Sequence, residues 1–128
     1  MSIRIEVAPG EIIDKLTILE IKRERIGDEA KRKNVAHEWD VLTRDLDAAV
    51  KKTPALDALR AKLKEINLKL WVIEDDIRDC ERAKDFGPKF IELARAVYFT
   101  NDERAAVKRQ INELLGSAIM EEKSYAAY

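Results

Sequence analysis

The stretch "LDALRAKLKEINLKLWVIEDDI", residues 56–77, decides the fold. Its large apolar residues recur at alternating steps of three and four, which is the spacing of one helical face. They are Leu56, Leu59, Leu63, Ile66, Leu70, Ile73 and Ile77. The pattern predicts a helix over 54–83, a rod of about 45 Å. Thr53 and Pro54 are suited to cap and begin it.

The segment before this rod, residues 29–51, carries a second seam with the same spacing. Its members are Val35, Trp39, Leu42, Leu46 and Ala49. The spacing is that of a coiled coil, although the seam is short. Only a few residues join this predicted helix to the next, so we expect the two to pack as an antiparallel hairpin.

Residues 11–26 form a third predicted helix, and it is apolar on two sides. Ile12 and Leu16 share one face, whereas Ile18 and Ile21 lie nearly opposite. A helix of this kind is sandwiched, either inside a bundle or between subunits.

The segment "KDFGPKF", residues 84–90, interrupts the helical pattern. A short helix is expected over 88–98. Thr100 followed by Glu103 resembles a capping box, which predicts the start of a fifth helix that runs to about residue 116.

The N-terminal "IRIEV", residues 3–7, alternates apolar and charged residues as a strand does. No second strand within the chain is available to pair with it. It either pairs with its own copy in a dimer or forms an extended arm, and the extended arm is expected. The sequence therefore predicts an all-α, antiparallel helical bundle with a long helical hairpin and a short N-terminal extended arm. We expect a single helical domain over 1–128.

The charge balance restricts the class of partner. Lys and Arg number 24 against 25 Asp and Glu, which gives a net charge of −1. No overall field would draw the chain to nucleic acid or to an anionic membrane. One cysteine, the absence of a signal-peptide pattern at the N-terminus and the absence of a long apolar run favour a cytoplasmic location.

Most common catalytic arrangements are missing from the sequence. His37 is the only histidine, which excludes a histidine-rich metal site. Cys80 lies near the apolar seam of 54–83 and is assigned to packing. Four scattered glycines form no phosphate-binding loop. We therefore predict no cofactor and assign no catalytic or metal-ligating residue.

The candidate ligand-binding residues are polar side chains at the borders of the apolar faces: Asp14, Glu20, Glu74, Arg78, Asn101, Arg104 and Lys108. Charges in such places either pair with each other or face a cavity. One interpretation is a set of ion pairs between helices. The other is a pocket in which Arg78, Arg104 and Lys108 hold a small anion.

An enzymatic alternative uses the carboxylates. All-α nucleotide pyrophosphatases bind magnesium through paired E-x-x-E and E-x-x-D motifs on neighbouring helices. The nearest matches are Glu11-x-x-Asp14 and Asp76-x-x-Asp79, the second of which begins with Asp where Glu is expected. A small magnesium-dependent or anion-handling enzyme is the alternative function.

Four strings carry a family resemblance: "GEIIDKLTILEIKRERI", "LWVIEDDIR", "DFGPKFIELARAVYFTNDERAAVKRQIN" and "EEKSY". Together they resemble an uncharacterised family of small bacterial all-α proteins, a domain of unknown function. The resemblance implies a bacterial cytosolic protein, with relatives beside surface-polysaccharide assembly functions. It assigns no residue a role.

The leading functional hypothesis is a non-catalytic interaction or small-ligand-binding helical protein, accessory to surface-polysaccharide assembly. We expect a homodimer, because the two-sided helix 11–26 and the seam of 54–83 need cover. A small anionic ligand or a protein partner is also expected, whereas nucleic acid and membrane are not.

Overall fold

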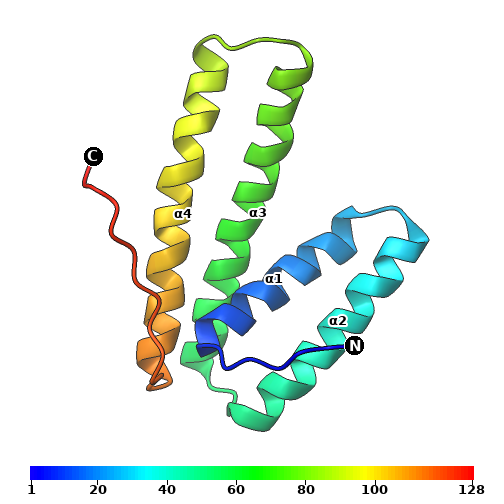
Figure 1. Ribbon diagram of the computed structural model, residues 1–128, viewed down its shortest axis with the longest axis vertical. Coiled ribbons are helices and arrows are strands. Elements are labelled where there is room, and N and C mark those ends of the chain that lie inside the picture. Colours follow the sequence, from blue (N-terminus) through cyan, green and yellow to red (C-terminus); the bar gives the residue numbers. More distant parts are fainter.

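A computed structural model describes all residues 1–128 and contains four helices and no strand. They are α1 (Pro9–Arg25), α2 (Glu29–Ala49), α3 (Pro54–Arg82) and α4 (Pro88–Leu114) (Figure 1). The all-α prediction is confirmed. Residues 3–7 are exposed and unpaired, as expected of an extended arm. None of the helices is both long and apolar enough to cross a membrane.

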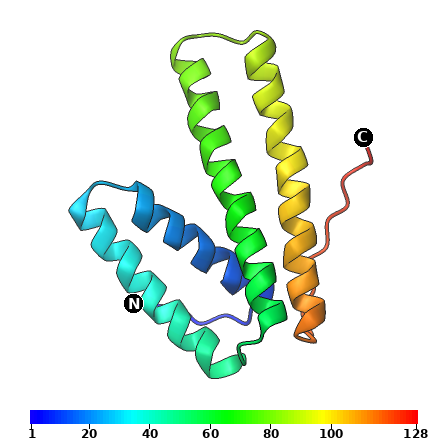
Figure 2. The ribbon, with the colours of Figure 1, turned by 180° about the vertical axis from the view of Figure 1, so that it is seen from behind.

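The helices form two antiparallel hairpins that diverge from a common base (Figures 1 and 2). The long hairpin is α3 with α4, and the shorter one is α1 with α2. The predicted pairing of 29–51 with 54–83 is wrong, because α2 packs along α1 and not along α3. The short connection joins only the ends of these two helices, while α1 packs against α2, α3 and α4.

The sequence-based division of residues 88–116 into two helices is also wrong. α4 runs unbroken through residues 99–103, and Thr100 is 1% exposed inside it rather than at a helix start. Leu93, Val97, Thr100, Val107 and Ile111 keep a regular helical spacing across the proposed break. Continuous packing along α3 therefore outweighs the local capping preference, which is worth about 1 kcal/mol.

The two apolar sides of α1 are covered within the chain itself. Arg23 stacks on Trp39 of α2, with 5.0 Å from its guanidinium carbon to the ring centroid. Leu16 and Ile12 lie on the same side of α1 by helical spacing. The opposite side, which includes Thr17, faces α3. The sandwich expected from the sequence is thus formed within one chain, and α1 gives no argument for a dimer.

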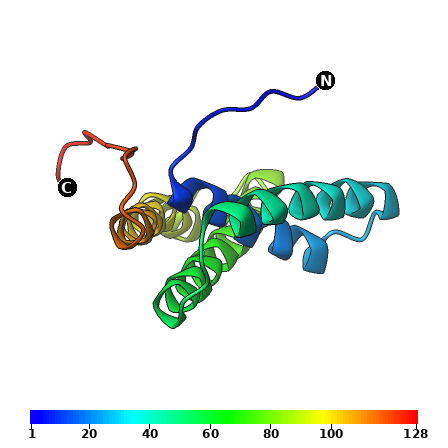
Figure 3. The same ribbon diagram turned by 90° about the horizontal axis from the view of Figure 1, so that it is seen from below.

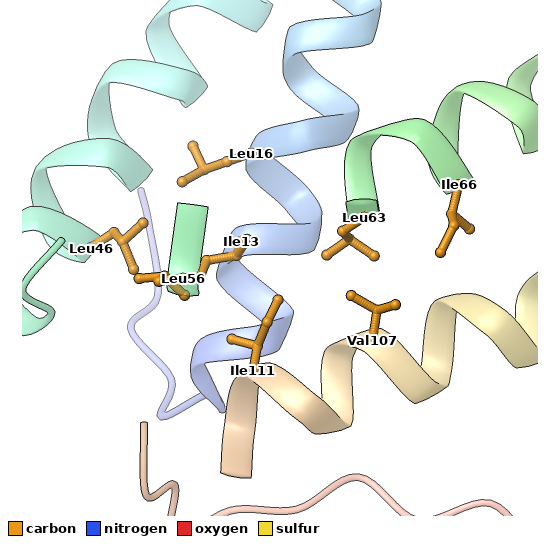
Figure 4. Close-up of a cluster of buried hydrophobic side chains, with 8 residues drawn as sticks. All are labelled: Ile13, Leu16, Leu46, Leu56, Leu63, Ile66, Val107 and Ile111. Carbon is orange, nitrogen blue, oxygen red and sulfur yellow. The ribbon is translucent and has the colours of Figure 1, made fainter. Parts of the chain in front are cut away.

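The main hydrophobic core lies at the base, where α1 crosses the long hairpin (Figure 4). All four helices contribute to it: Ile13, Leu16, Leu46, Leu56, Leu63, Ile66, Val107 and Ile111. Seen from below, α1 lies between α2 and the α3–α4 pair (Figure 3). The upper part of the α3–α4 hairpin extends beyond α1 and has no third helix against it (Figure 1).

Local signals set most helix ends. The Thr53 hydroxyl accepts a hydrogen bond from the Leu56 amide at 3.2 Å and Pro54 begins α3, which confirms the predicted cap. α4 ends where Gly116 adopts φ +62°, a conformation that favours glycine. The Ser117 amide then donates to the Asn112 carbonyl at 2.9 Å, which closes the helix end.

Gly10 lies at a close approach of α1 to α4. A Cβ atom at this position would lie 2.6 Å from the Lys108 carbonyl oxygen and 2.8 Å from Asn112 Oδ1. Its amide donates to Asn112 Oδ1 at 2.7 Å. Since the first amides of a helix have no partner within it, the Asn112 side chain serves as the cap that Ala8 does not supply.

Replacement of Gly10 by alanine should therefore separate α1 from α4. We expect Gly10→Ala to lower the free energy of unfolding by about 1–3 kcal/mol, because backbone atoms of α4 must move. Chemical denaturation measures the loss. The matched control is Gly27→Ala, since a Cβ atom there would meet nothing within 4 Å. Equal stability of the two variants would contradict the close approach.

Candidate functional site

Asp14 of α1 is the centre of a buried polar cluster at the base of the long hairpin. Its side chain is 2% exposed. Arg104 of α4 holds both carboxylate oxygens, with Nε at 2.9 Å from Oδ1 and a terminal nitrogen at 2.5 Å from Oδ2. Asn67 of α3 donates to Asp14 Oδ1 at 2.9 Å. Thr17 accepts from the same Asn67 amide at 2.9 Å, so three helices meet in this cluster.

Lys108 lies one turn beyond Arg104 on α4 and is similarly engaged. Its side chain is 11% exposed, and Nζ donates to Glu11 at 2.8 Å and to Glu121 at 2.9 Å. A hollow of about 230 Å³ adjoins it. Its lining comprises Glu6, Val7, Ala8, Glu11, Lys108, Asn112, Ile119 and Glu121. Three carboxylates and one ammonium give this hollow an acidic character.

The hydrogen bond from Arg104 to Asp14 raises the pKa of Arg104 above its usual value, although burial acts in the opposite direction. Burial lowers the pKa of Lys108, but its hydrogen bonds to Glu11 and Glu121 outweigh that effect and leave it raised. Both cations therefore stay charged throughout the physiological pH range. Neither can act as a general base near neutral pH.

The other candidates from the sequence lie elsewhere. Glu20 pairs with Arg60 of α3 at 3.3 Å. Glu74 and Arg78 form an exposed pair along α3 at 2.8 Å. Asn101 is partly exposed on α4, and its side chain makes no hydrogen bond within the chain. The structure thus brings Asp14 and Arg104 together, with Lys108 beside them.

The carboxylates of the magnesium alternative are not gathered. No group of three or more His, Cys, Asp or Glu side chains is placed to hold a metal ion together. Asp14 has both oxygens occupied by Arg104 and Asn67, and Glu11 is bound to Lys108. The Glu11-x-x-Asp14 motif therefore binds cations of the protein itself.

The set of candidates taken from the sequence omitted four residues that build this region. They are Thr17, Asn67, Asn112 and Glu121. Asn67 continues a polar stripe beside the leucines of α3, so its position on a border was a usable signal. Asn112 and Glu121 have partners 102 and 13 residues away, and only the folded chain shows these contacts.

Loss of the central carboxylate should destabilise the fold strongly. Asp14→Asn leaves Arg104 without its counter-charge, so we expect a loss of about 2–4 kcal/mol; the 30% exposure of Arg104 keeps this toward the lower end of the usual cost of breaking a buried pair. Urea denaturation followed by circular dichroism measures it. The control is Glu74→Gln, which breaks an exposed pair and should cost less than about 0.5 kcal/mol. Similar losses in both variants would contradict a structural role for Asp14.

The contact between Lys108 and Glu121 gives a pH-dependent prediction. The hydrogen bond from Lys108 lowers the pKa of Glu121 below its usual 4.5. The folded pKa is depressed, so this contact stabilises the attachment of residues 117–128 above that value. The stabilisation is lost as the pH falls through the folded pKa. NMR titration of the Glu121 carboxyl carbon should show the lowered pKa, and Lys108→Met should raise it toward the ordinary value, because Lys108 is the largest cause of the shift. An ordinary pKa in the wild type would contradict the contact.

Comparison with known proteins places the chain in a family but near no characterised relative. No curated protein and no solved structure shows significant similarity to it. Residues 3–128 match the model described as "Family of unknown function (DUF6165)". This match confirms the resemblance to an uncharacterised family that the four sequence strings suggested. The match covers nearly the whole chain, which therefore belongs to the DUF6165 family.

Proposed function

We propose that this protein is a non-catalytic binding protein, which recognises a partner or a small ligand through its surface. The observation that carries the proposal is the pairing of the candidate cations. Arg78, Arg104 and Lys108 each bind a carboxylate of the same chain. An anion would have to displace these carboxylates, so the polar cluster is better suited to fix the helices than to bind substrate.

The surface supports recognition of another protein. Large apolar side chains are exposed on the long hairpin, including Phe86, Ile91, Tyr98 and Phe99. Monomeric proteins rarely expose a contiguous apolar patch unless that patch binds a partner or a ligand. We propose a homodimer as the working form, in a cytoplasmic bacterial protein accessory to surface-polysaccharide assembly. The family resemblance supports the bacterial setting and the link to surface polysaccharide.

Among the candidate cations taken from the sequence, Lys108 is the one that lines a hollow in which a small ligand could lie. The hollow has about 230 Å³, somewhat below the usual size of ligand pockets. Its single ammonium could meet an anionic group only after Glu11 or Glu121 moves away. The small anionic ligand expected from the sequence is therefore a weaker proposal than a protein partner.

A turnover assay separates binding from catalysis. We expect nucleoside triphosphates with Mg²⁺ to release neither phosphate nor pyrophosphate and to leave the melting temperature unchanged. A ligand at 100 times its dissociation constant would stabilise the fold by about 2.7 kcal/mol, which a thermal-shift screen detects readily. The screen also includes sugar nucleotides.

The informative variant is Glu11→Gln. Its carboxylate is 37% exposed, so the change should leave the fold intact. Pyrophosphate release by the wild type that disappears in Glu11→Gln would overturn the proposal and support the magnesium-dependent alternative. Release that persists in Glu11→Gln would point to a contaminating enzyme.

A further inference from the structure

The outer side of α4 carries a cluster of exposed aromatic rings, which takes no part in the polar cluster around Asp14. Tyr98 is 43% exposed, Phe99 is 40% exposed, and their ring centroids lie 4.9 Å apart. Ile91, two turns earlier, is 55% exposed. Between Ile91 and Phe99 the surface forms a shallow depression of about 500 Å³. We call Ile91, Arg95, Tyr98, Phe99 and Asp102 the outer patch.

The outer patch has the spacing of a helix–helix contact. Residues 91, 95, 98 and 102 step by four, three and four along α4. This is the spacing of a seam that meets another helix. Ala105 and Ala106 follow in the next turn, and their small side chains let a second backbone come close.

Part of the patch is covered by the end of the chain, but thinly. The Tyr128 ring packs against Phe99 at 4.7 Å and Tyr98 at 5.4 Å between centroids, and its hydroxyl donates to Asp102. Tyr128 itself is 72% exposed. One exposed ring does not remove Ile91, Tyr98 and Phe99 from water.

The charges on the outer patch lack ionic partners. Arg95 makes no ion pair within the chain, and its guanidinium carbon lies 5.7 Å from the centre of the Phe99 ring. Asp102 binds only the Tyr128 hydroxyl. By contrast, the three cations that follow Arg95 on α4 all have carboxylate partners: Arg104, Lys108 and Arg109. The outer patch thus presents a cation and an anion without ionic partners, two turns apart on one face of α4. A surface that carries the opposite charges at the same spacing would form ion pairs with both.

The solvent-accessible surface of the chain is larger than a compact monomer requires, which is consistent with a partner that covers part of it. The chain exposes 9013 Å². A compact monomer of 14.7 kDa exposes about 6,900 Å², so the excess is roughly 2,100 Å². The extended residues at the two ends account for part of it. A standard interface takes only about 800 Å² from each partner.

We propose that the outer patch binds the outer patch of a second copy of this chain, with the two α4 helices antiparallel. A two-fold axis between Tyr98 and Phe99 places Arg95 of one copy opposite Asp102 of the other. Arg95 lies three residues before Tyr98, and Asp102 lies three residues after Phe99. The same axis brings the Tyr98 and Phe99 rings of both copies together at the centre, and sets Ile91 against Ala106. The exposed Tyr128 ring of each copy, which packs on Tyr98 and Phe99, must move aside for this contact. The contact is self-complementary, as a symmetric dimer requires.

This inference rests on the proposed function and names its partner. Light scattering after gel filtration should give twice the 14.7 kDa of one chain. Charge reversal by Arg95→Asp, or separately by Asp102→Arg, places like charges opposite each other twice in each dimer. Each should weaken dimerisation by roughly a hundredfold. The double variant exchanges the charges and should restore the dimer. Val41→Asp on α2, at a site that is also 40% exposed, is the control that should remain dimeric.

The outcomes separate the two proposals. If both charge reversals stay dimeric, the outer patch is not the interface, although a homodimer survives. If the wild type is monomeric, the second copy is excluded, and a binding protein with another partner remains. Unchanged helical circular dichroism in each variant shows that a loss of dimer is not a loss of fold. Failure of the double variant to recover would refute the antiparallel arrangement.

Discussion

The fold depends on one buried carboxylate. Asp14 is removed from water, and a charge in that position is tolerated only when it is fully paired. Its partners come from two other helices, Arg104 of α4 and Asn67 of α3. Apolar burial is not directional, so the packed core by itself specifies the position of α1 on the long hairpin less sharply than hydrogen bonds do. The directed hydrogen bonds of Asp14 allow one position, and Gly10 permits the contact distance that this position needs.

The sequence predicts where the helices lie along the chain better than it predicts which helices pack against each other. Periodicity located α1, α2 and α3, because the burial of a helical face leaves a regular pattern in one segment. It could not show that α1 lies between α2 and α3, since this depends on contacts between distant segments. The error at Thr100 has the same origin. Its capping pattern is local, whereas the packing that keeps α4 continuous involves the whole length of α3.

The sequence indicates which charged residues of the site lie at the edge of an apolar helix face. It does not indicate which of them bind one another. Asp14 and Arg104 stood out because each is a charge at the edge of an apolar face. Their pairing spans 90 residues and leaves no mark in either segment. Glu74 and Arg78 have the same borderline placement and form only a surface pair. Placement on a helix therefore identifies residues that need a partner, while the tertiary arrangement decides which of them become buried.

The continuity of α4 has a mechanical consequence. Arg104 and the Tyr98–Phe99 pair stand within two turns of each other on one stiff rod of about 40 Å, with no hinge between them. A tilt of α4 at its exposed rings would also move the Arg104 guanidinium that binds Asp14 of α1. If binding at the outer patch tilts α4, it also changes the free energy of the contact between Arg104 and Asp14, and linkage makes that effect reciprocal. Two helices joined at residue 100 would have absorbed such a tilt and kept the two events independent.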